Sequence, residues 1–388
     1  MSRRLRLGLA LIAVLVIGLP AAAAVFLYTA DYNRYKGLIA DAVTDATGRQ
    51  LVIKGDLTIA ISLLPEVVVT DVTLANAPWA SQPQMAHIGQ LRVRLKLLPL
   101  LMRDVDITRI KLIDTDLLLE IDASGQANWQ FSPKATSRTG VGMRGVAVEQ
   151  LAVERLAVTL RSGETGSPPT HYNLDSFKLT RSAAADSMAV ELKGSSNGQP
   201  VTLSGQTGPL EDLFAGVRFP ILLSGDLAGT ATKLHGEMSN ALTREGLDLT
   251  VEASGTDLAT LGAGVAVKLP QTDGFDMTAH LTGSGDDLTL QEVHGSVSYK
   301  GLKLAMNGEV GNLNVFEGIR LDLEGSGNNL AELSSIVGET LPKTGPFEVS
   351  GKLAGTARAL ALSEAQGTIG QQSIKVSLAG KVDDLIAL

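Results

Sequence analysis

Residues 301–327 read GLKLAMNGEVGNLNVFEGIRLDLEGSG, and this segment decides the fold class. Apolar side chains stand at every second position over residues 302–306 and again over residues 319–323, with charged or small residues between them. Because successive side chains of a β-strand point to opposite faces, each run predicts a strand with one apolar and one polar face. Glycines flank both runs and favour turns there.

The same pattern returns along the second half of the chain at a fixed spacing. Ser254 and Ser326 are 72 positions apart, and further residues match at this spacing without a gap: Gly255 and Gly327, Leu258 and Leu330, Leu269 and Leu341, Pro270 and Pro342, Phe275 and Phe347, Leu281 and Leu353, Gly283 and Gly355, Gly295 and Gly367, Gly308 and Gly380, Leu313 and Leu385. This spacing predicts repeat units at residues 254–325 and 326–388, each a short helix followed by several strands. Such units stack end to end. A further helix is expected just after Leu385, so we expect the array to be incomplete at its C-terminal end.

The composition agrees with a strand-rich chain and argues against several classes of function. Of the 388 residues, 44% are hydrophobic and 41 are glycine, which predicts a mainly β structure with short helices and many turns. The net charge is −8 and no basic stripe is present, so we expect no nucleic-acid partner. The absence of cysteine excludes disulfides and thiolate metal sites.

The N-terminal thirty residues predict a membrane anchor. Arg3, Arg4 and Arg6 precede an almost uncharged stretch, residues 7–28, which as a helix would be about 33 Å long and could cross a bilayer. Basic residues before the span predict a cytoplasmic N-terminus and an exported remainder. In the alternative interpretation this stretch is a cleaved signal peptide, with Pro20 as its break and residues 22–24 as the cleavage site. Both interpretations export the rest of the chain.

Three regions follow from these patterns. Residues 1–30 form the cytoplasmic tip and the transmembrane anchor, residues 31–135 an N-terminal module, and residues 136–388 the repetitive β-rich region. The module begins with a predicted amphipathic helix at residues 31–48, where Gly48 can end the helix. Its apolar positions recur at helical spacing: Tyr35, Leu38, Ile39, Ala42, Val43 and Ala46. Alternating strands follow, for example over residues 91–97.

A series of short motifs in this module resembles the N-terminal region of the AsmA family of bacterial envelope proteins. The motifs are DVTLANAPWA at 71–80, the basic strand at 91–97 with LPLL at 98–101, VDI at 105–107, IKL at 110–112, LLLE at 117–120 and GQANW at 125–129. Each is short, but they occur in the family's order behind an N-terminal apolar segment. The resemblance covers residues 1 to about 135 well and the glycine-rich repeats more loosely.

The resemblance implies a location, a fold and a role. AsmA-like proteins are anchored in the inner membrane as single-pass proteins and extend into the periplasm. Their expected fold is an elongated, curved β-sheet with an apolar groove, similar in architecture to the chorein-type bridge-like lipid-transfer proteins. The implied role is to hold or guide phospholipid in support of outer-membrane biogenesis and lipid homeostasis.

The residues themselves give a candidate site that agrees with this role. If one sheet runs through the repeats, the apolar positions of its strands form one continuous surface. The candidate groove residues are Leu302, Leu304, Met306, Ile319, Leu321, Leu323, Val349, Leu353, Ile374, Val376 and Leu378. An open surface of this size exceeds what soluble proteins usually expose, so acyl chains are a plausible occupant. A closed β-structure with a dry core is the alternative, and it would favour a structural or regulatory envelope protein that binds outer-membrane protein precursors or assembly factors.

We expect no catalytic, cofactor or metal site. Gly194, Ser196 and Gly198 fit the pattern G-x-S-x-G, but strand residues follow instead of a helix, which favours a hairpin turn. The five histidines lack metal-ligand spacing, and His280 and His294 are expected on polar faces or in loops. The chain is therefore expected not to be an enzyme, with membrane phospholipid and possible envelope proteins as partners.

The topology can be tested in spheroplasts. A protease added outside should digest the chain beyond about Asp31 and leave the anchor in the membrane fraction. Recovery of a soluble form that begins near Ala23 or Val25 would support the signal-peptide interpretation instead.

Overall fold

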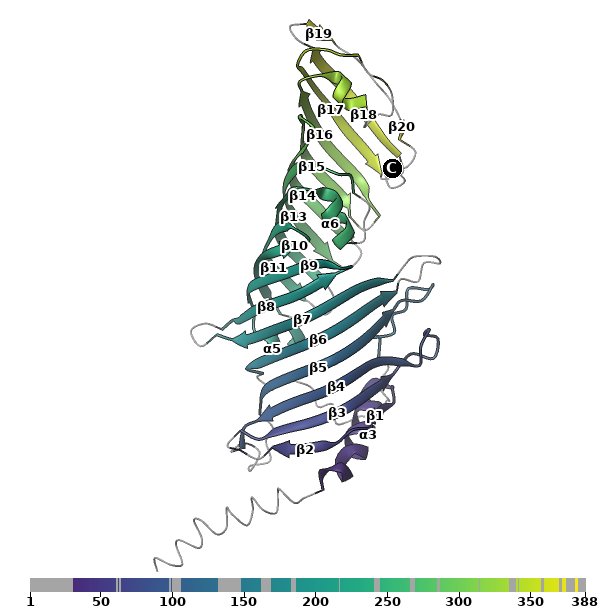
Figure 1. The fold of residues 1–388 in the computed structure, drawn as a ribbon, viewed down its shortest axis with the longest axis vertical. Coiled ribbons are helices and arrows are strands. Elements are labelled where there is room, and N and C mark those ends of the chain that lie inside the picture. Colours follow the sequence, from purple (N-terminus) through teal and green to yellow (C-terminus); the bar gives the residue numbers. More distant parts are fainter. Residues whose placement is uncertain are drawn as a thin grey trace, which may run out of the picture. The chain divides into compact units, whose positions relative to one another are not determined.

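The computed structural model describes residues 31–60, 62, 64–97, 99, 106–131, 148–161, 169–182, 186–215, 217–240, 245–265, 269–284, 287–313, 315–334, 340, 342–356, 359–369, 372–374 and 381–382. The predicted membrane span at residues 7–28 lies outside them. Within the described part, no helix has the length and apolar character that crossing a membrane requires. The chain forms two compact units, Met1–Pro169 and Thr170–Leu388, which are described one after the other (Figure 1).

The first unit opens with the helix predicted from the sequence. Asp31 caps a 3-10 turn, η2 (Tyr32–Tyr35), by accepting a hydrogen bond from the Asn33 amide at 3.0 Å. The α-helix α3 (Lys36–Thr47) follows directly, and Gly48 ends it in the left-handed conformation with a φ of 71°.

Six strands complete the first unit: β1 (Leu51–Ile53), β2 (Leu57–Ala60), β3 (Glu66–Ala75), β4 (Gln84–Leu95), β5 (Ile107–Glu120) and β6 (Gln150–Arg161). Strands β1 and β2 pair with consecutive parts of β3, and β3, β4 and β5 are antiparallel neighbours. The pairing of β5 with β6 is parallel. Leu57, Val69 and Val72 form a buried core beside η2, with Tyr32 packed against it.

The second unit is an antiparallel sheet in which each strand pairs with the next. Its strands are β7 (Thr170–Arg181), β8 (Met188–Ser196), β9 (Gln199–Thr207), β10 (Phe219–Leu227), β11 (Thr230–Asn240), β12 (Glu245–Gly255), β13 (Gly274–Ser284), β14 (Asp287–Tyr299), β15 (Leu302–Asn312), β16 (Glu317–Gly327), β17 (Phe347–Thr356) and β18 (Ala359–Ile369). The short strands β19 (Gln372–Ile374) and β20 (Lys381–Val382) both pair with β18. The prediction of a mainly β structure with short helices is confirmed.

Among the described residues of this unit, three short helices interrupt the sheet. They are α5 (Leu210–Ala215) before β10, α6 (Leu258–Gly264) before β13 and the 3-10 turn η3 (Leu330–Leu333) before β17. Helix α6 contacts the end of β8, where Ser196 Oγ donates a hydrogen bond to the Gly264 carbonyl. Ser196 is the last residue of β8, and Asn197 and Gly198 form the two-residue turn to β9, as predicted.

The 72-residue repeat is visible in the hydrogen bonds that start each helix. Asp257 Oδ1 accepts from the amides of Ala259 and Thr272, both at 3.1 Å, and the Leu258 amide donates to Thr272 Oγ1 at 2.9 Å. Seventy-two residues on, the same atoms make the same bonds: Asn329 Oδ1 accepts from the amides of Ala331 at 3.0 Å and Thr344 at 2.9 Å, and the Leu330 amide donates to Thr344 Oγ1 at 3.0 Å. The repeat architecture is therefore confirmed.

The structural repeat also reaches further back than residue 254. Strands β15 and β16 begin and end 72 residues after β11 and β12. Gly236 and Gly308 occupy the same place in this repeat and have φ values of 144° and 152°. At both positions a Cβ atom would approach a carbonyl oxygen of the next strand to about 2 Å: Asp248 O at 2.1 Å and Arg320 O at 2.0 Å.

Replacing Gly308 by alanine should therefore destabilise the second unit. Strained backbone and the clash with Arg320 O together predict a loss of about 2–3 kcal/mol in the free energy of unfolding. The matched control is Gly345→Ala, because a Cβ at Gly345 meets nothing within 4 Å. Denaturant titrations should show a lower midpoint for Gly308→Ala, and equal midpoints for the two variants would contradict the argument.

Candidate functional site

The paired strands of the second unit place their apolar residues in continuous rows. The longest row, here called the long row, crosses β7 to β17 through successive cross-strand partners: Phe177, Leu192, Leu203, Gly225, Thr232, Ala253, Met277, Gly295, Met306, Leu323 and Gly351. Directly opposed residues in a sheet lie on the same face. Thr232 is the polar exception, and its hydroxyl donates to the Thr230 carbonyl at 3.2 Å. The long row is therefore apolar except at Thr232.

A second row, here called the outer row, runs beside the long row. It joins Phe275, Val297, Leu304, Gly325, Val349 and Gly367 as successive partners from β13 to β18. On the other side of the long row, Leu321 pairs with Leu353 and Leu353 with Leu362. Together these rows make one wide apolar face.

The opposite face of the same strands is polar. Lys233 Nζ lies 2.9 Å from Glu252 Oε2, and Lys352 Nζ lies 2.7 Å from Glu364 Oε2. The hydrogen bond from Lys233 lowers the pKa of the Glu252 carboxyl, and the one to Glu364 raises the pKa of the Lys352 amine. Arg320 likewise pairs with Glu309. These exposed ion pairs contribute little to stability, but they keep this face polar and hydrated.

The apolar face is covered at the helix-bearing strand ends and becomes exposed two residues further along the strands. Leu302 and Phe347, near the helix-bearing ends of β15 and β17, are 7% and 3% exposed. Along the same strands, Leu304 and Val349 are 38% and 42% exposed. Most other residues of the rows are half-buried. The described part of the unit thus presents an apolar surface that solvent can reach.

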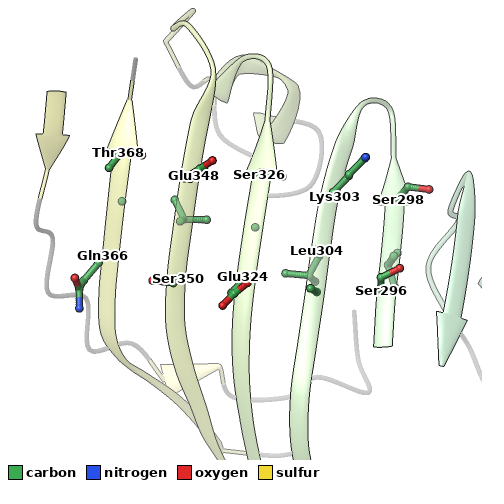
Figure 2. A pocket seen from close by; sticks show the side chains of 15 residues that line it. Ser296, Ser298, Lys303, Leu304, Glu324, Ser326, Glu348, Ser350, Gln366 and Thr368 are labelled. Atoms are coloured by element: carbon green, nitrogen blue, oxygen red, sulfur yellow. The ribbon is translucent and has the colours of Figure 1, made fainter. Parts of the chain in front are cut away.

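A hollow of about 950 Å³ is centred on the outer row (Figure 2). Its lining consists of Val297, Leu304, Gly325, Val349 and Gly367 with their chain neighbours on five adjacent strands. Figure 2 shows the neighbours as mainly polar, among them Ser298, Lys303, Glu324 and Gln366. The apolar row lines the hollow, and the polar neighbours alternate with it along each strand, so that their side chains point to the opposite face.

The structure brings together the predicted groove residues that it describes. Leu304 and Val349 belong to the outer row, and Met306 and Leu323 to the long row. Leu321 and Leu353 pair with each other, and the buried Leu302 and Ile319 lie on the same face towards the strand ends. Ile374 pairs with Gly367, but its side chain is outside the described residues, as are Val376 and Leu378. Contact of these side chains with lipid stays a prediction.

Sequence reasoning missed several members of the face. Phe275 and Val297 extend the outer row, and glycines such as Gly325 and Gly351 fill apolar positions in it and in the long row. In their strands these glycines keep the two-residue spacing of the apolar residues, so the sequence contained the pattern that places them on this face. A strand pattern that accepts glycine as apolar would have found them.

The histidines stand apart from the apolar face, as expected. His280 Nε2 lies 2.7 Å from Asp248 Oδ1, and His294 Nδ1 lies 2.7 Å from Asn307 Oδ1. Both pairs are exposed on the polar face. Among the described residues, no group of three or more histidine and carboxylate side chains is placed to hold a metal ion.

A second cluster, in the first unit, gathers residues from three of the AsmA-like motifs. Asn128 is fully buried, and its side chain donates to Asn76 Oδ1 and to the Leu118 carbonyl, both at 2.9 Å, while accepting from the Glu120 amide at 3.0 Å. Glu120 is 5% exposed and accepts from the Ser81 amide at 3.1 Å. The motifs at 71–80, 117–120 and 125–129 thus meet in one buried polar network.

Comparison with known proteins agrees with this convergence. The model of the AsmA family matches residues 1–155, which include all of these motifs. The AsmA resemblance is confirmed. The chain is also 24% identical over 324 residues to the AsmA family protein YhjG of Escherichia coli (strain K12), an alignment that covers 76% of this chain and 46% of that protein. The chain thus matches about half the length of this AsmA relative.

The AsmA-type polar network should be a major determinant of stability in the first unit. Asn128→Ala removes two donors and one acceptor from a site without water access, which predicts a loss of about 2–4 kcal/mol in the free energy of unfolding. Gln126→Ala, two residues away and exposed, should change stability by less than about 0.5 kcal/mol. Thermal unfolding of both variants checks this, and a similar melting temperature for the two would contradict a structural role for the network.

Proposed function

We propose that this AsmA-type chain is a non-enzymatic envelope protein that holds phospholipid acyl chains on the apolar face of its second unit. The observation that carries the proposal is the continuous long row together with the exposure of Leu304 and Val349. Apolar surface of this extent is unfavourable in water. Acyl chains can cover it without a specific pocket.

The dimensions of the face support a lipid occupant. The long row crosses eleven strands, so at about 4.8 Å per strand it is roughly 48 Å long when measured straight. One leaflet of a bilayer contributes about half of the 30 Å hydrocarbon thickness, and an acyl chain is therefore about 15 Å long. The long row can accept more than one chain, which fits a surface along which lipids move.

The proposed place of action is the periplasmic side of a bacterial inner membrane. The predicted anchor at residues 7–28 and the basic residues before it support this location. Lipid would move by diffusion along the apolar rows, since among the described residues no charged side chain stands within them. Support of outer-membrane biogenesis is the role that follows from such movement.

Photo-crosslinking at single positions tests the lipid occupant in cells. A photoreactive amino acid replaces either Leu304 or Val349 in the full-length chain, and phospholipids are labelled with radioactive phosphate. The proposal expects labelled adducts at both positions, at least about fivefold above those at Lys303 and Ser350, whose side chains point to the opposite face.

A second pair of variants separates occupancy from folding. Leu304→Asp should reduce crosslinking from position 349, because a carboxylate beside the outer row disfavours acyl chains. Lys303→Asp should leave it unchanged. Adducts with protein instead of lipid at positions 304 and 349 would support a scaffold that binds envelope proteins. Equal labelling on both faces would contradict the proposal.

A further inference from the structure

Helix α3 carries an apolar stripe that the protein leaves uncovered. The sequence places Tyr35, Leu38 and Ile39 on the apolar side of an amphipathic helix, the side that normally packs on a core. In the structure these three side chains are 41%, 68% and 36% exposed. No residue of α3 is buried. The stripe therefore faces away from the first unit.

A different side of α3 contacts the sheet, and it is held at both ends. Lys36, Ala40, Val43, Thr44 and Thr47 are the half-buried positions of the helix. Near the helix end, the Leu51 amide of β1 donates to Thr44 Oγ1 at 3.4 Å. These contacts fix the rotation of α3 about its axis.

The η2 turn before the helix is fixed to the sheet as well. The Leu57 amide of β2 donates to Asn33 Oδ1 at 3.1 Å, and Tyr32 packs against the core of Leu57, Val69 and Val72. A core-facing role for the stripe would require these bonds to break. The exposure of the stripe is thus a property of how η2 and α3 are attached.

The position of α3 in the chain identifies what can cover the stripe. Tyr32, the first residue of η2, comes four residues after Tyr28, the end of the predicted membrane span, so the turn begins within about 14 Å of that end. Arg34 and Tyr35 lie side by side in η2, with a hydrogen bond of 2.9 Å and the guanidinium 4.8 Å from the ring centre. Aromatic and basic side chains of this kind favour the lipid headgroup region.

We propose that the stripe Tyr35, Leu38 and Ile39 lies in the interfacial region of the membrane, so that α3 rests on the bilayer and sets the angle of the first unit. The third side of the helix, with Asp41, stays in water. An amphipathic helix with one apolar side binds the headgroup boundary in this manner. The proposal rests on the predicted anchor and is independent of the lipid occupant of the second unit.

The absence of cysteine from the chain allows a direct test. Single variants Leu38→Cys, Ile39→Cys and Asp41→Cys of the full-length protein carry an environment-sensitive fluorophore and are placed in vesicles of phosphatidylethanolamine and phosphatidylglycerol. Quenching is then measured with spin-labelled lipid and with aqueous iodide. We expect spin-labelled lipid to quench positions 38 and 39 about twofold or more better than position 41, and iodide to show the reverse order.

Two outcomes overturn the proposal. Iodide quenching at position 38 as strong as at position 41 would show that the stripe is in water. Protection of position 38 from both quenchers would show that protein covers the stripe, for example a second copy of the chain. Leu38→Asp gives an independent readout, since it should bring iodide quenching at position 39 close to that at position 41, whereas Gly37→Asp on the water side should not. Lipid crosslinking at Leu304 is unaffected by any of these results, so failure here and failure of the proposed function are distinguishable.

Discussion

Constant register between neighbouring strands is the constraint on which the second unit depends. Met306 pairs with Leu323, and Lys303 pairs with Ser326 on the opposite face. Because side chains alternate, a slip of one residue would place Lys303 among the apolar rows and Leu304 among the ion pairs. The hydrophobic pattern therefore selects the register. The register in turn joins short apolar runs from separate strands into the long row, which no single strand could form.

Bulges preserve this register where the sequence changes phase. In β14 the apolar residues Leu290 and Val293 are three positions apart instead of two, and a regular strand would turn Val293 to the polar face. The structure inserts one extra residue at this point, with Glu292 at a φ of 48°, and the pairing shifts between Thr278 and His280. In the next repeat Glu364 has a φ of 53° and the pairing shifts between Ser350 and Lys352. Alternating faces thus survive an irregular sequence.

Alternation, the 72-residue spacing and the AsmA motifs could be read from the sequence, because each depends on residues close in the chain or on exact repetition. The bulges could not, since they depend on which strands become partners. Helix α3 shows a different limit. Its apolar positions were predicted correctly as an amphipathic pattern, but a pattern does not say which side meets the sheet. The side chains of Thr44 and Asn33 accept hydrogen bonds from β1 and β2, and these bonds determine which side of the helix meets the sheet. The buried network around Asn128 likewise joins motifs that are separate in the sequence.

The exposure of Leu304 and Val349 follows from the small size of the helices in the repeat. A strand of eleven residues such as β15 is about 36 Å long, whereas the seven residues of α6 make only about 10 Å of helix. Four strands, β13 to β16, separate α6 from η3, so each short helix covers a strand end and little else. Gly264 of α6 sits against Ala228, in the turn after β10, and η3 brings Glu332 beside Gly301, in the turn after β14. The short helices therefore leave Leu304 and Val349, two residues in from the covered strand ends, exposed to solvent.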